Sequence, residues 1–126
     1  MKFTNEEEIT TEALLDTIIK GIQDKKGREI VTLNISKLEN SLCDYFVICH
    51  GTSSRHVDGI IDSIEQIVKK ELNEKPFHKE GIENLTWVLL DYASVIIHVF
   101  QKEYREFYNL EDLWGDAPMH KYQDVQ

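Results

Sequence analysis

Residues 44–59, DYFVICHGTSSRHVDG, combine a glycine turn with small hydroxyl side chains in a way that could bind phosphate. An apolar run ends at Gly51, and a helical pattern starts after Thr52, Ser53 and Ser54. The first N–H groups of a helix lack partners within the helix, and the helix dipole favours an anion there. Because the glycine and lysine spacing of a nucleotide-binding loop is missing, we interpret Ser53 or Ser54 as a helix cap and Gly51 as a turn residue.

The histidines and cysteines raise the question of a metal or nucleophile site. No two histidines stand four residues apart, and none has the spacing of a zinc motif, so we expect no metal and no cofactor. A nucleophile built from Cys49 and His98 is an alternative, although cysteine in a buried strand is usually an inert hydrophobe. The five histidines are His50, His56, His78, His98 and His120.

Asp44 and Asp91 flank apolar runs and are candidates for a pair of metal-binding carboxylates. Such a pair would hold Mg²⁺ in a nucleotidyltransferase-like enzyme. The competing interpretation is that each carboxylate bonds the backbone of a turn, as Asp commonly does. Because no set of basic residues for a triphosphate accompanies them, this enzyme remains the alternative function.

Residues 101–118, QKEYREFYNLEDLWGDAP, interleave aromatic with acidic side chains. This mixture suits contact with a basic protein surface. For Phe107 and Tyr108, burial in the core is an equally good interpretation. The acids are Glu103, Glu106, Glu111, Asp112 and Asp116, and the aromatic residues are Tyr104, Phe107, Tyr108 and Trp114.

Hydrophobic periodicity predicts the elements that position these residues. The order is helix, two strands, helix, three strands, helical turns, which predicts one α/β domain with a mixed sheet of about five strands. Two amphipathic helices cannot cover both faces of such a sheet, so we expect helices mainly on one face. The first helix is expected to have its cap at Thr10 or Thr11, the second at Ser53 or Ser54, and helical turns are expected over 103–115. The strands are expected at 28–35, 44–50, 77–81, 86–91 and 94–100.

Composition limits the class of partner. The 126 residues suffice for one domain with a real core, and a net charge of −9 argues against direct binding to nucleic acid. We see no signal peptide and no membrane-spanning run, which predicts a cytoplasmic protein. Residues 1–9 and 119–126 are polar and aperiodic, so we expect a domain at 10–118 between two flexible tails.

The sequence closely resembles the ribosomal silencing factor family, also called Iojap-like proteins. The resemblance rests on DYFVICHGTSSRHVDGI, the Glu80–Gly81 pair, WVLLDYASVIIHVF and REFYNLEDLWGDAP, in this order. It implies a nucleotidyltransferase-like core without catalytic equipment. It also implies a non-enzymatic factor that binds the large ribosomal subunit through a ribosomal protein at the subunit-joining face. Such a factor obstructs the small subunit sterically and lowers translation when nutrients are short.

A tight turn at Tyr92 and Ala93 would pair Trp87 with His98 and divide the hairpin side chains between two faces. One face collects Val88, Leu90, Val95, Ile97 and Val99, which suits packing under helices. The other mixes aromatic, apolar and ionisable groups, as interface cores do. We predict that it joins the C-terminal stretch to contact a basic ribosomal protein, unless that stretch folds over it as a lid. The predicted contact residues are Trp87, Leu89, Asp91, Tyr92, Ile96, His98, Phe100, Arg105, Tyr108, Leu110, Glu111 and Trp114. A homodimer of the free protein through this uncovered face is a third reading.

Overall fold

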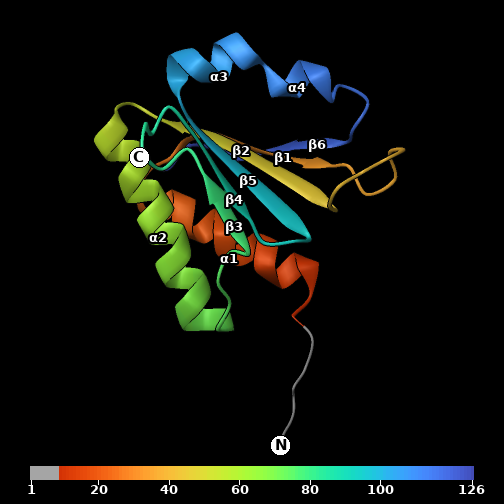
Figure 1. Cartoon of the computed structure of the whole chain (residues 1–126), viewed down its shortest axis with the longest axis horizontal. Coiled ribbons are helices and arrows are strands. Elements are labelled where there is room, and N and C mark those ends of the chain that lie inside the picture. Colours follow the sequence, from red (N-terminus) through yellow and green to blue (C-terminus); the bar gives the residue numbers. More distant parts are fainter. Residues whose placement is uncertain (1–8) are drawn as a thin grey trace, which may run out of the picture.

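The chain folds into three layers, with a mixed sheet between two pairs of helices (Figure 1). The structure is a computed structural model that describes residues 9–126, so all of the expected N-terminal tail except Ile9 lies outside the described residues. In chain order the elements are α1 (Thr11–Asp24), β1 (Arg28–Asn34), β2 (Tyr45–Gly51), α2 (Ser54–Leu72), β3 (His78–Glu80), β4 (Trp87–Asp91), β5 (Val95–Gln101), α3 (Lys102–Tyr108), α4 (Leu110–Leu113) and β6 (Met119–Lys121). The predicted α/β class is confirmed, and the predicted element order is confirmed as far as α4; β6 is an additional strand.

The sheet has six strands in the order β3-β4-β5-β2-β1-β6. β2 and β5 are parallel, the other neighbours are antiparallel, and β2 is internal as predicted. The expected flexible tail at 119–126 is contradicted at its start, because Met119–Lys121 form β6 on the edge of β1. The Tyr122 N–H continues this pairing by donating to the Ile30 carbonyl at 2.9 Å. Three exposed residues are too few to produce a periodic pattern.

α1 and α2 form the layer below the sheet in Figure 1. Both predicted caps are confirmed: Thr10 Oγ1 accepts from the Ala13 N–H and Ser53 Oγ from the His56 N–H, each at 3.0 Å. Their apolar faces form one core with the sheet, which buries Ile18, Ile22, Ile60, Ile64, Val47 and Val99 completely. Within residues 9–126, no helix combines the length and the apolar character needed to cross a membrane.

The β4–β5 hairpin has the predicted faces but not the predicted register. Trp87 pairs with Phe100 instead of His98, a shift of two residues. The longer connection is stabilised because Ala93 takes a left-handed backbone (φ 74°) and its N–H donates to Asp91 Oδ1 at 2.8 Å. Since strand side chains alternate with a period of two, the shift keeps every side chain on its predicted face. The aliphatic set lies in the core with α1 and α2.

The second face of the sheet carries its own apolar cluster, centred on Phe46, Ile48, Phe100 and Leu110. β5 runs directly into α3, and α3 and α4 lie over this face (Figure 1). The helices therefore lie mainly on one face, as predicted, but the other face is not bare. The C-terminal stretch acts as the lid that was the alternative to an open docking face.

Gly59 lies in the interior of α2, where an added methyl group would meet no atom within 4 Å. Glycine within a helix costs about 1 kcal/mol relative to alanine. We expect Gly59→Ala to raise the free energy of unfolding by about 0.5–1 kcal/mol in urea denaturation. Gly81→Ala is the contrasting variant and should destabilise, because φ is +83° and the new Cβ would collide with the Trp87 carbonyl. A less stable Gly59→Ala protein would contradict this open helix surface.

Candidate functional site

An aromatic cluster fills the space between the sheet and α3–α4. The Trp87 ring lies 5.0 Å from that of Phe100, nearly parallel to it, and 4.7 Å from that of Tyr108 on α3. The Phe46 ring stands edge-on to His98 at 4.8 Å and to Trp114 at 5.3 Å. Aromatic rings on β2, β4 and β5 thus contact α3 and the residue that follows α4, in the stacked and edge-on geometries that aromatic pairs favour.

Arg105 holds α3 in place through a second set of contacts, which are hydrogen bonds. Its guanidinium is buried and donates to Glu111 Oε2 at 2.7 Å, to the Arg28 carbonyl at 3.3 Å and to His50 Nδ1 at 3.0 Å. Burial, followed by the neighbouring Arg105 charge, lowers the pKa of His50, so this imidazole stays neutral and accepts the bond. These hydrogen bonds of Arg105, called the Arg105 cluster below, therefore connect α3 to α4, β1 and β2.

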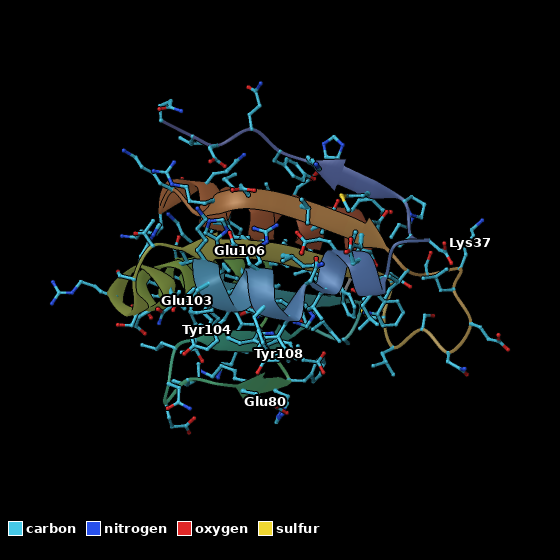
Figure 2. The ribbon with its side chains drawn as sticks, turned by 90° about the horizontal axis from the view of Figure 1, so that it is seen from above. Lys37, Glu80, Glu103, Tyr104, Glu106 and Tyr108 are labelled. Atoms are coloured by element: carbon cyan, nitrogen blue, oxygen red, sulfur yellow. The ribbon has the colours of Figure 1, made fainter. Side chains whose placement is uncertain are left out.

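The outer surface of α3 and α4 is both apolar and acidic. Phe107 is 79% exposed and Leu113 is 73% exposed, and Tyr104 and Tyr108 are also accessible. Figure 2, which looks down on α3, shows Tyr104 and Tyr108 on the side of the helix toward β3 and Glu106 on the opposite side. The exposed acids outnumber the single exposed base, Lys102; they are Glu103, Glu106, Asp112 and Asp116.

The structure divides the predicted contact residues by accessibility. Phe100 is only 1% exposed, and it cannot touch a partner while α3 and α4 cover it. Tyr92 lies in the opposite core, and among the described residues its hydroxyl has no hydrogen-bond partner. The buried members are Tyr92, Ile96, His98, Phe100, Arg105 and Leu110; the half-buried ones are Trp87, Leu89, Asp91, Glu111 and Trp114; Tyr108 is exposed.

Two prominent residues of this surface were absent from the predicted set. Phe107 was recognised as an aromatic residue of the stretch, but its sequence position did not separate exposure from burial. Leu113 gave no signal, because an isolated leucine in a four-residue helix normally faces the core. The sequence did not reveal that Arg105 points into the protein. Because Arg105 is buried, Phe107, two residues later on the same short helix, faces solvent.

The Gly51 turn is closed by hydrogen bonds of His56. The Thr52 N–H donates to His56 Nδ1 at 2.9 Å, and His56 Nε2 lies 2.7 Å from the Lys25 carbonyl oxygen. A Cβ on Gly51 would lie 3.1 Å from the His56 ring, which explains the glycine. The interpretation of this segment as a capped helix with a turn glycine therefore holds, and His56 links α2 to the end of α1.

The candidate carboxylates have structural partners. Asp91 caps the hairpin through Ala93, and Asp44 Oδ2 accepts a hydrogen bond from Thr11 Oγ1 at 3.3 Å. In the part of the chain that the structure describes, no three His, Cys, Asp or Glu side chains converge as metal ligands would. The turn-bonding interpretation is confirmed for Asp91 but not for Asp44, whose carboxylate bonds a side chain at the start of α1 instead of a turn backbone.

The Cys49–His98 alternative is wrong. Cys49 faces the core with α1 and α2, whereas His98 faces α3 and α4 from the neighbouring strand. Burial raises the pKa of the Cys49 thiol to about 12 and that of Cys43 to about 11, so neither thiol forms the nucleophilic thiolate readily. Both cysteines are free.

Fold and surface together define a single α/β domain that presents an aromatic, acidic face. The family model described as "Ribosomal silencing factor during starvation" matches residues 8–126. The chain belongs to the ribosomal silencing factor family, as the sequence resemblance predicted. Its role is therefore ribosome-associated silencing, which is a form of translation regulation.

Relatives support this assignment in sequence and in structure. "Ribosomal silencing factor RsfS" of Halalkalibacterium halodurans is 37% identical over 110 residues, which span 87% of this chain and 92% of that one. A crystal structure of a Chromobacterium violaceum protein superimposes with a TM-score of 0.79 and 32% identity, over 85% of this chain and 88% of that one. "Mitochondrial assembly of ribosomal large subunit protein 1" of Mus musculus is 31% identical over 102 residues, 79% of this chain and 44% of that protein.

Proposed function

We propose that this protein binds the large ribosomal subunit through a basic ribosomal protein at the subunit interface. Bound there, it blocks joining of the small subunit by its bulk and represses translation. The family assignment supports the ribosome as target, and the name of the mouse relative supports the choice of the large subunit. The proposal places the protein in the cytoplasm with the ribosomes and involves neither a membrane nor recognition of a nucleic-acid sequence.

The exposed surface of α3 and α4 is the observation that carries this proposal. Large apolar side chains that gather in water mark interaction sites. Phe107 on α3 and Leu113 on α4 are exposed side chains of this kind, and the Phe107 ring stands edge-on to that of Tyr108 at 5.1 Å. The acids around them complement a basic protein surface. A chain with a net charge of −9 is repelled by ribosomal RNA, so a basic ribosomal protein is the favourable contact. We propose that half-buried Trp87, Leu89 and Trp114 complete this docking surface.

Truncation of Phe107 should weaken docking strongly. Removing an aromatic anchor typically costs about 2 kcal/mol, which corresponds to about a 30-fold loss of affinity. The measurement is sedimentation of the purified protein with isolated large and small subunits. Phe77→Ala is the matched control, because Phe77 is 74% exposed but lies just before β3, outside α3 and α4.

The expected result is pelleting of the wild-type protein and Phe77→Ala with the large subunit only, and loss of pelleting by folded Phe107→Ala. Pelleting with the small subunit alone, or with neither subunit, would overturn the proposed function. Equal binding by Phe107→Ala and wild type would overturn this choice of surface. Self-association is the competing use of the same apolar side chains, and light scattering of the free protein measures it.

The nucleotidyltransferase-like enzyme has less support, because Asp44 and Asp91 already have structural partners. The family role is regulatory, which agrees with a docking function.

A further inference from the structure

His98 lies beneath the docking surface at the centre of the aromatic cluster. It is 5% exposed and sits on β5, where its neighbours across the sheet are Leu89 and Ile48. Its Nδ1 atom accepts a hydrogen bond of 3.1 Å from Trp87 Nε1. Burial lowers its pKa to about 4, so the ring is neutral at neutral pH.

The bond to Trp87 determines which nitrogen of His98 carries the proton. An indole N–H can only donate, so Nδ1 must supply the lone pair and Nε2 must carry the hydrogen. Across residues 9–126, this buried Nε2 has no hydrogen-bond partner. A buried donor without an acceptor is costly, and phenylalanine would fill the same space without that cost. What histidine gives this site, and phenylalanine cannot, is the acceptor for Trp87.

Trp87 in turn connects the sheet to the docking helix. Its indole is half-buried and lies against two rings on β5, those of Phe100 and His98, and against the Tyr108 ring on α3. The hydrogen bond to His98 restricts rotation of the indole, and the indole supports the Tyr108 ring. An anchor that is already fixed before binding loses less conformational entropy when it meets its partner.

We propose that His98 is a positioning residue for docking: its Nδ1 lone pair fixes the Trp87 indole, so that Trp87 and Tyr108 meet the partner protein in a preset arrangement. This inference rests on the proposed function. His98 itself does not touch the partner. It acts through Trp87, and loss of its acceptor should weaken binding by about tenfold, the size expected for one hydrogen bond that becomes unpaired.

Three substitutions separate this positioning role from simple packing. His98→Asn keeps an acceptor close to the position of Nδ1 but loses volume. His98→Gln places its polar atoms near the position of Nε2, and His98→Phe keeps the volume but has no acceptor. A positioning role predicts that the His98→Asn protein binds the large subunit better than the His98→Phe or His98→Gln protein. A packing role predicts instead that His98→Phe binds best and His98→Asn worst.

The state of the indole is measured directly by NMR. The chain has two tryptophans, so a ¹⁵N-labelled sample gives two indole N–H signals, and the Trp87 signal is the one that disappears in Trp87→Phe. We expect this signal to move upfield and exchange faster with water in His98→Phe, and to stay near its wild-type position in His98→Asn. Affinities come from sedimentation with the large subunit, after circular dichroism has shown that each variant is folded.

Three outcomes of these measurements separate the inference from the proposed function. Tenfold weaker binding by His98→Phe, with recovery in His98→Asn and the matching indole shifts, supports the inference. Equal binding by wild type and His98→Phe, while Trp87→Ala loses binding, overturns the inference and leaves the proposed function intact. Absence of wild-type pelleting with the large subunit overturns the proposed function, and the inference falls with it.

Discussion

Glu111→Ala should lower the free energy of unfolding by about 3 kcal/mol or more, because it leaves a buried guanidinium without its counter-charge. Arg105 and Glu111 are joined by two hydrogen bonds, of 2.7 and 3.2 Å, and their side chains are 8% and 22% exposed. Among residues 9–126, Arg105 would then keep the Arg28 carbonyl and His50 as its acceptors. Urea denaturation followed by circular dichroism measures the loss.

An exposed ion pair provides the control for this prediction. Glu71 lies 3.5 Å from Lys20, with both side chains well exposed to water. Glu71→Ala should cost less than about 1 kcal/mol, because solvent screens such pairs. Similar losses in the two variants would mean that Arg105 is not held in a buried site. A double variant with Arg105→Met should recover part of the loss, since it removes the stranded charge.

The Arg105 cluster also explains why the predicted contact surface needed correction. From residue type alone, aromatic side chains are expected in the protein core and charged ones at its surface. On α3 the order is reversed, with Arg105 buried and Phe107 in water. The partners that make this possible, His50 and the Arg28 carbonyl, lie 55 and 77 residues away in the sequence. Local pattern cannot reveal contacts of that kind.

The hairpin shows what a pattern does predict. Alternation of side chains assigned Val88, Leu90 and Ile97 to the core face, and the structure places them there. The register was wrong, because the left-handed backbone of Ala93 and the cap from Asp91 allow a longer connection than the expected tight turn. Faces depend on a period of two, which survives a shift of two residues, whereas register depends on turn geometry.

Helix starts were predictable for a different reason. Thr10 and Ser53 stand directly before amphipathic runs, and each side chain accepts the backbone N–H that a capping residue should accept. β6 gave no comparable signal. Its attachment depends on long-range contacts, such as the bond of the Glu29 N–H to Asp124 at 2.8 Å. The position of a short edge strand of this kind is determined by the rest of the sheet, so its own residues do not predict it.

The folded protein should lose stability as the pH falls from 6.5 to 4, by about 3 kcal/mol through His98 alone. Burial lowers the pKa of His98 from its ordinary value of 6.5 to about 4. Above pH 6.5 the imidazole is neutral in both states, so its contribution is fully present. Between pH 6.5 and about 4, His98 is protonated in the unfolded chain but stays neutral in the folded protein. This difference in proton binding favours unfolding as the pH falls. The lowered pKa of His50 acts in the same direction.

Urea denaturation at a series of pH values tests this origin of acid sensitivity. His98→Phe removes the titrating group, so its free energy of unfolding should vary less between pH 6.5 and pH 4.5 than that of the wild type, whatever its value at pH 7. His78→Asn is the control, because His78 is an exposed histidine, and it should keep most of the wild-type slope. The window above pH 4.5 matters, because most carboxylates titrate below it and would add their own slope. Parallel curves for wild type and His98→Phe would show that protonation of His98 does not limit stability, and that water or local opening reaches the ring beneath α3 and α4.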